Sequence, residues 1–135
     1  AAAMAGVIVD ASVVIALLNP EDAHHSRAAG LLVEAPEEDL HIPAVTLAEA
    51  LVWHVRAGTG ERALEVLEDL GLRVIESQED PLELARVRAE SGLRMPDCIV
   101  LHHALTRGEA LATMDERLLR VAGERGLRTL PHPRG

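Results

Sequence analysis

Two acidic residues stand directly after apolar segments that are expected to be buried. Asp10 follows the β-branched run Val7–Val9, and Asp115 follows the predicted strand 110–113. Burying an ionised carboxylate is costly unless charge or hydrogen bonds compensate it. Because open α/β sheets bind ligands at the carboxyl ends of their strands, both acids are candidate site residues at one edge of a sheet.

Two further carboxylates have equally unusual surroundings. Glu49 is the single charge in the apolar helical turn 47–51, and Asp97 lies at a predicted helix N-terminus, where the macrodipole favours an anion. A cluster of such carboxylates repels itself and needs cations, and hard oxygen ligands select Mg²⁺ or Mn²⁺. Two such ions roughly 4 Å apart activate water for phosphodiester hydrolysis. Ser12 and Thr113 each lie two residues from an acid and are expected to orient it by hydrogen bonding.

Each acid also has an ordinary structural interpretation. Asp10 could cap the first helix, Asp97 and Asp115 could be common first-turn acids, and Glu49 could pair with Arg56 or another arginine. Their joint occurrence at the sheet edge and helix starts of one small domain favours the functional interpretation.

The remaining reactive side chains are interpreted as structural. The adjacent pairs His24-His25 and His102-His103 point to different helix faces, so they are not expected to bind metal. Cys98 is expected to be a packed small residue. Trp53 is expected to lie in the core or in a subunit interface.

Apolar periodicity and punctuation by glycine and proline predict twelve elements. Pro43 is expected to confine its strand to an edge, or itself to a strand terminus. The order β-α-α-β-α-α-β-α-α-β-α-β predicts one α/β domain with a mostly parallel sheet of about five short strands, flanked by helices. The expected strands are 7–9, 40–43, 72–75, 110–113 and 127–130, and the expected helices are 11–18, 22–35, 46–56, 59–70, 80–91, 96–107 and 115–125.

Composition limits the possible functions. The 135 residues suffice for one domain, which is expected to cover residues 4–135. The three alanines before Met4 are expected to be foreign to the protein. No apolar run approaches the roughly 20 residues that span a bilayer, and no secretory signal precedes the first strand, so a cytoplasmic location without membrane contact is expected. The net charge of −9 and the near absence of aromatic residues argue against generic nucleic-acid binding. A domain that binds divalent cations or a basic partner is favoured.

At these residues the chain resembles the PIN-domain ribonucleases, in particular the VapC-type toxins of bacterial toxin–antitoxin pairs. The matching segments are VIVDASVVIALL, TLAEAL, MPDCIVL and LATMDERLLRVA, which occur in this order and at fitting intervals. The resemblance covers residues 6–130 and implies a single PIN-like domain.

The resemblance also implies a metal-dependent endoribonuclease that hydrolyses RNA phosphodiesters with metal-activated water. Asp10, Glu49, Asp97 and Asp115 would bind Mg²⁺ or Mn²⁺, with Ser12 and Thr113 beside them. The expected partners are a structured RNA such as a transfer RNA, a second copy in a homodimer, and a small antitoxin with a basic segment. RNA contacts must come from arginines, because the chain has no lysine, and Arg94 beside the Asp97 motif is the leading candidate.

Two other functions stay open from the sequence. A PIN-like fold could act as a non-catalytic binding or scaffold module, or as a structure-specific DNA nuclease with the same metal site. Dehalogenase-like phosphatases and receiver domains are disfavoured because they need a lysine near their aspartate. A P-loop or dinucleotide fold is disfavoured because Asp10-Ala11-Ser12 lacks the necessary glycines.

Overall fold

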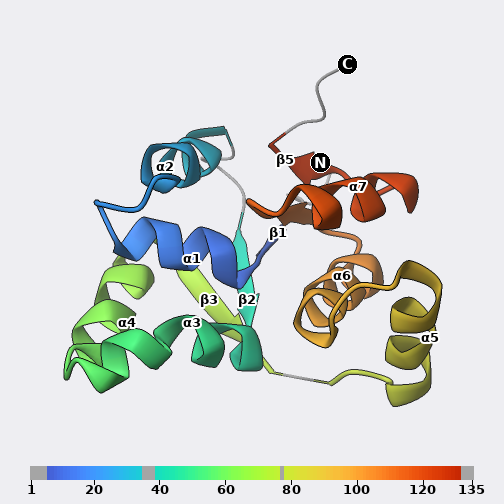
Figure 1. Ribbon diagram of the computed structural model, residues 1–135, viewed down its shortest axis with the longest axis horizontal. Helices are drawn as coiled ribbons and strands as arrows, with labels where there is room; N and C mark the ends of the chain where they lie inside the picture. Colours follow the sequence, from blue (N-terminus) through green and yellow to red (C-terminus); the bar gives the residue numbers. More distant parts are fainter. Residues whose placement is uncertain (1–5, 35–38, 77, 132–135) are drawn as a thin grey trace.

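A computed structural model describes residues 6–34, 39–76 and 78–131. The expectation that the three alanines before Met4 are foreign therefore lies outside the described residues. The observed element order is the predicted one, so the α/β fold expected from the sequence is confirmed (Figure 1).

Five parallel strands form one sheet in the order β3-β2-β1-β4-β5. β1 occupies the centre, where both faces are covered, which explains its wholly apolar composition. The register pairs Val9 of β1 with Ala112 of β4, so the residues after these two strands emerge side by side. The strands are β1 (Val7–Val9), β2 (Leu40–Pro43), β3 (Leu72–Ile75), β4 (Ala110–Ala112) and β5 (Thr129–Leu130).

Seven helices are seen in the described residues, and they divide into two groups (Figure 1). Along β1, Val7 and Val9 pack into one apolar cluster with residues of α1 to α4, whereas Ile8 packs into another with residues of α5 to α7. This alternation is the two-residue period of a strand covered on both faces. The helices are α1 (Ala11–Leu18), α2 (His25–Glu34), α3 (Ala44–Arg56), α4 (Gly60–Asp69), α5 (Pro81–Ser91), α6 (Met95–Arg107) and α7 (Glu116–Glu124).

The helix ends follow local chemistry. Asp80 caps α5 by accepting hydrogen bonds from the backbone N–H groups of Leu82 and Glu83, and Pro81 occupies the first turn. Gly92 and Gly108 end α5 and α6 with φ of 70° and 66°, a left-handed conformation that favours glycine. Both stops place a short loop before the next element.

Some predicted boundaries were wrong. α2 begins at His25 rather than at residue 22, because the Asp22 carboxylate accepts from the His24 N–H in the preceding turn. Of the two places expected for Pro43, the strand terminus is confirmed, since Pro43 ends β2, which lies inside the sheet between β1 and β3. None of the helices in the described ranges has the length and apolar character needed to cross a membrane.

Candidate active site

Asp10 is the most buried of the four acids, with 5% of its surface exposed. It lies between β1 and α1 and caps α1 by accepting a hydrogen bond of 3.3 Å from the Val13 N–H. Two hydroxyl groups also donate to its carboxylate, Ser12 to Oδ1 at 2.5 Å and Thr113 to Oδ2. Burial raises the pKa of Asp10 and outweighs these hydrogen bonds, which lower it. The helix-cap interpretation is therefore correct, and the same carboxyl group is also held at the sheet edge by two hydroxyls.

Backbone N–H groups fix the orientation of these two hydroxyls. Ser12 Oγ accepts from the Met114 N–H, and Thr113 Oγ1 accepts from the Asp115 N–H, both at 3.0 Å. Each hydroxyl that accepts from the backbone can direct its own hydrogen to Asp10. The network thereby ties the start of α1 to the loop between β4 and α7.

Asp97 is half-buried in the first turn of α6. Burial raises its pKa, and the negative charges of Asp115 and Glu49 raise it further. The positive charges of Arg94 and Arg117 act in the opposite direction. These effects on Asp97 indicate that Asp115 and Glu49 lie near it in space.

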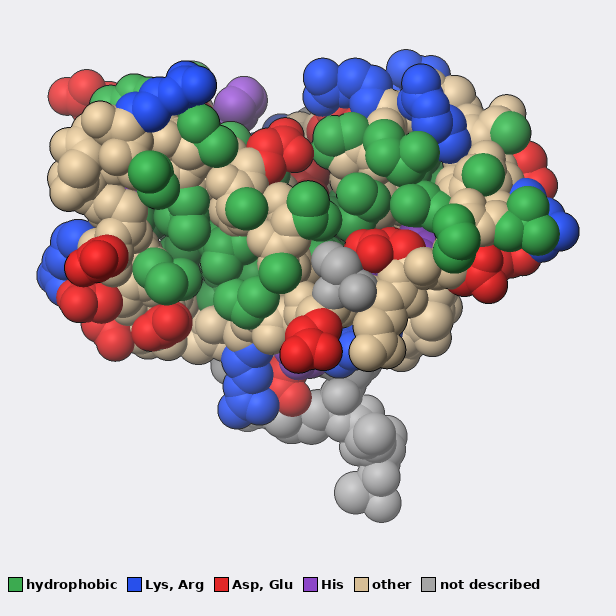
Figure 2. Space-filling model, turned by 90° about the horizontal axis from the view of Figure 1, so that it is seen from below, with side chains coloured by type: hydrophobic (Ala, Val, Ile, Leu, Met, Phe, Trp, Pro, Cys, Tyr) green, Lys and Arg blue, Asp and Glu red, His purple; other side chains and the backbone are tan. Residues whose placement is uncertain are grey.

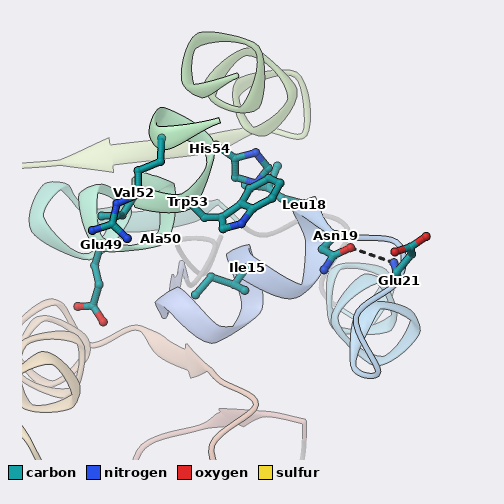
Figure 3. A pocket seen from close by; sticks show the side chains of 10 residues that line it. Ile15, Leu18, Asn19, Glu21, Glu49, Ala50, Val52, Trp53 and His54 are labelled. Carbon is teal, nitrogen blue, oxygen red and sulfur yellow. Dashed lines mark hydrogen bonds between the residues drawn. The ribbon is translucent and has the colours of Figure 1, made fainter. Parts of the chain in front are cut away.

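Asp115 caps α7 by accepting a hydrogen bond of 3.0 Å from the Leu118 N–H, and Glu49 is exposed on α3. The pairing of Glu49 with Arg56 or another arginine that the sequence allowed is absent among the described residues. Figure 3 shows the Glu49 side chain pointing away from Trp53, which belongs to a neighbouring apolar hollow.

The structure brings all four acids to one cavity of about 180 Å³. They come from four separate segments: the end of β1, the middle of α3, the start of α6 and the start of α7. Arg94 lines the same cavity, as does Ser12. The full lining is Asp10, Ala11, Ser12, Ile15, Thr46, Glu49, Arg94, Pro96, Asp97, Val100 and Asp115.

The donor set fits a hard divalent cation. Its donors are carboxylate oxygens, whose mutual repulsion a cation would relieve. Within the described ranges, however, no three Asp, Glu, His or Cys side chains converge closely enough to hold one ion as they stand. Mg²⁺ usually keeps several of its waters, so it suits carboxylates that surround a cavity without closing on a point.

Sequence reasoning missed two residues near the site. Thr46 is buried in the first turn of α3, just after β2, and lines the cavity. Its position at the carboxyl end of a strand was the signal that could have identified it. Arg117 influences Asp97 from α7, and nothing in the local sequence indicated that proximity.

The other reactive residues lie outside the cavity lining. His102 and His103 are buried, and His103 Nε2 lies 3.0 Å from Glu79 Oε1. Cys98 is buried with its thiol directed to the Leu93 carbonyl, and burial raises its pKa. Trp53 is 69% exposed because it projects from the solvent side of α3, so the core is the wrong one of its two expected places, and a subunit interface stays a prediction.

Comparison with known proteins agrees with the fold. The structure is similar to PAE2754 from Pyrobaculum aerophilum, with a TM-score of 0.65 and 25% identity over 94% of this chain and 90% of that one. It is similar to Mycobacterium tuberculosis VapC20, a sarcin-ricin loop cleaving toxin, with a TM-score of 0.69 and 19% identity over 86% of this chain and 95% of that one.

A third similar structure is DNA-bound VapBC from Salmonella typhimurium, with a TM-score of 0.65 and 21% identity over 93% of this chain and 97% of that one. No curated protein sequence matches significantly. The family model of the PIN domain matches residues 7–124, which is most of the chain. The protein is therefore a member of the PIN domain family.

Proposed function

We propose that this protein is a metal-dependent endoribonuclease and the toxin of a toxin–antitoxin pair. The observation that carries the proposal is the gathering of four carboxylates from four segments around one cavity, one of which, Asp10, is held by two hydroxyls. Membership of the PIN domain family and the fold shared with VapC toxins support it.

Asp10, Glu49, Asp97 and Asp115 would hold Mg²⁺ or Mn²⁺ in this site. When bound, the cation supplies Lewis-acid stabilisation of a phosphodiester and lowers the pKa of water. Ser12 and Thr113 keep the Asp10 carboxylate in one orientation, so that no reorganisation is needed when substrate arrives. Arg94 at the cavity would contact a phosphate oxygen of the RNA.

The expected partners follow from the same proposal. The substrate is RNA, with a transfer RNA as the first candidate, and an antitoxin with a basic segment would neutralise the acidic cavity. One of the similar structures is described as DNA-bound VapBC. We propose a homodimer that acts in the cytoplasm.

The test is cleavage by chelator-treated protein, with and without Mn²⁺, of transfer RNA and of RNA and DNA oligonucleotides of one sequence. We expect metal-dependent RNA cleavage, and we expect Asp97→Asn to reduce it by more than about a hundredfold. Loss of a residue that only hydrogen-bonds to a metal ligand typically reduces activity by about 10–100-fold, so a larger loss indicates a ligand. Asp69→Asn, an exposed acid on α4, is the matched control. The circular dichroism of both variants should be unchanged.

The alternatives give different results in this assay. Cleavage of the DNA oligonucleotide alone would indicate a structure-specific DNA nuclease with the same metal site. No cleavage and no metal binding in wild type would indicate a scaffold or binding module. Undiminished metal-dependent cleavage by Asp97→Asn would refute the assignment of the four acids.

A further inference from the structure

A second hollow adjoins the acidic cavity on the side of α7. It is shallow and is lined by Asp115, Glu116, Arg117 and Arg120. Asp115 also lines the acidic cavity, so the two depressions meet at that residue. An RNA strand that crosses the acidic cavity can therefore continue over the first two turns of α7.

The two arginines of this hollow are available for an anion. Arg120 is exposed and makes no hydrogen bond or ion pair with a described residue. Arg117 is exposed, and it donates one hydrogen bond of 3.2 Å to the Gly92 carbonyl, a neutral partner. By contrast, Arg107 and Arg125 have their charges paired with glutamates.

Their positions relate them to the reacting centre. Arg117 and Arg94 both lower the pKa of Asp97, which places both cations near that acid. The Gly92 contact anchors Arg117 against the loop that leads to Arg94. Figure 2, in which the half that carries α5 to α7 lies on the right, shows arginine side chains gathered along the upper right border of the molecule.

The chemistry favours a phosphodiester strand. Residues three apart on a helix face the same way, with Cβ atoms about 5–6 Å apart, so Arg117 and Arg120 can each contact one of two neighbouring phosphates. Guanidinium groups bind phosphate oxygens in a bidentate manner. The chain has no Phe or Tyr, so stacking platforms for bases are scarce and phosphate contacts must supply most of the affinity.

We propose that Arg117 and Arg120 form a phosphate-binding arm that seats the RNA strand beside the acidic cavity. The inference rests on the proposed endoribonuclease function and extends it, because it assigns the direction in which the strand leaves the cavity. The arm acts in substrate binding and takes no part in bond cleavage.

The experiment compares steady-state cleavage of an RNA oligonucleotide of about twelve nucleotides by three proteins. They are wild type, Arg117→Gln/Arg120→Gln, and the control Arg27→Gln/Arg73→Gln, which removes the same charge from exposed arginines that do not line the acidic cavity. The arm predicts that KM rises about tenfold in the first variant at nearly constant kcat, as expected for two exposed charge contacts. The control should change KM far less.

A binding measurement with the RNA in EDTA, by fluorescence anisotropy, adds a second readout. Loss of two phosphate contacts should make the slope of log K against log salt shallower by about 1.4, since single strands contribute about 0.7 per contact. If the double variant fails to fold, the single variant Arg120→Gln replaces it, because this side chain has no partner within the part of the chain that the structure describes. It should show about half of this change in slope.

The outcomes separate the two proposals. Equal KM and salt slope in both double variants, with active wild type, would overturn the arm and leave the nuclease function standing. A fall in kcat at constant KM would also overturn it, because the arginines would then act in the chemical step. Wild type that neither cleaves nor binds RNA would overturn both.

Discussion

Replacing Thr113 by valine isolates the contribution of the hydroxyl that holds Asp10. Valine has nearly the same shape, and Thr113 has none of its surface exposed, so packing is kept while the bonds to Asp10 and from the Asp115 N–H are lost, together with a long 3.5 Å contact with the Ser12 hydroxyl. Where Asp10 is ionised, the hydrogen bond to its carboxylate is worth about 1.5–3 kcal/mol, and loss of an acceptor for the Asp115 N–H adds about 1 kcal/mol. We therefore expect the free energy of unfolding to fall by about 3 kcal/mol in chelator.

The assay is urea unfolding followed by far-ultraviolet circular dichroism, because the exposed Trp53 is a poor fluorescence reporter of folding. Thr129→Val is the matched control. Thr129 is also buried, with 4% of its surface exposed, and its hydroxyl donates to a neutral acceptor, the Pro131 carbonyl. Its loss should cost about 1 kcal/mol.

The charge dependence gives a sharper test. In an Asp10→Asn background the bond from Thr113 becomes a neutral one, so Thr113→Val should cost about 2 kcal/mol, which leaves a coupling of roughly 1 kcal/mol between the two residues. Because the Thr113 hydrogen bond lowers the Asp10 pKa, the cost should also shrink as pH falls and Asp10 becomes protonated. Equal costs for Thr113→Val and Thr129→Val, or no coupling to Asp10, would refute the reasoning.

Three further predictions concern metal, pH and thiol reactivity. Mn²⁺ at 100 times its dissociation constant should stabilise wild type by about 2.7 kcal/mol in thermal melting and should not stabilise Asp10→Asn, whereas an equal shift in both would exclude Asp10 as a ligand. Burial raises the pKa of Asp10 and Asp97 above 3.8, so the folded protein binds more protons than the unfolded chain. Chelated wild type should therefore lose stability as pH rises from about 4 through these raised values, and Asp10→Asn should lose less; a parallel pH profile would contradict this. Because burial raises the pKa of the Cys98 thiol, a thiol reagent at pH 7.5 should label it only at the rate of unfolding, and rapid labelling of native protein would refute its packed position.

Much of the fold was predictable because its signals are local. The β-branched run Val7–Val9 can only be stable with both faces covered, and Gly92 and Gly108 stop their helices by adopting a left-handed conformation. Alternation of strands and helices then leads to a parallel sheet. The start of α2 was mispredicted because the Asp22 side chain accepts a hydrogen bond from the His24 N–H within a turn and does not cap the helix.

The candidate site was partly predictable for the same reason. In a parallel sheet, residues that follow strands meet at one edge, so Asp10 and Asp115 could be placed there from the sequence. Glu49 and Asp97 were recognised by unusual local surroundings, and the structure places both at the same cavity.

What only the tertiary structure decided concerns contacts between segments far apart in the chain. The exposure of Trp53 depends on which face of α3 packs inward, and local periodicity left that face undetermined. The proximity of Arg117 to Asp97 depends on how α7 packs beside the loop before α6, which no local pattern encodes. Types and spacing of residues thus determined the acidic chemistry, while long-range packing determined which cations lie beside it and where a strand of substrate can run.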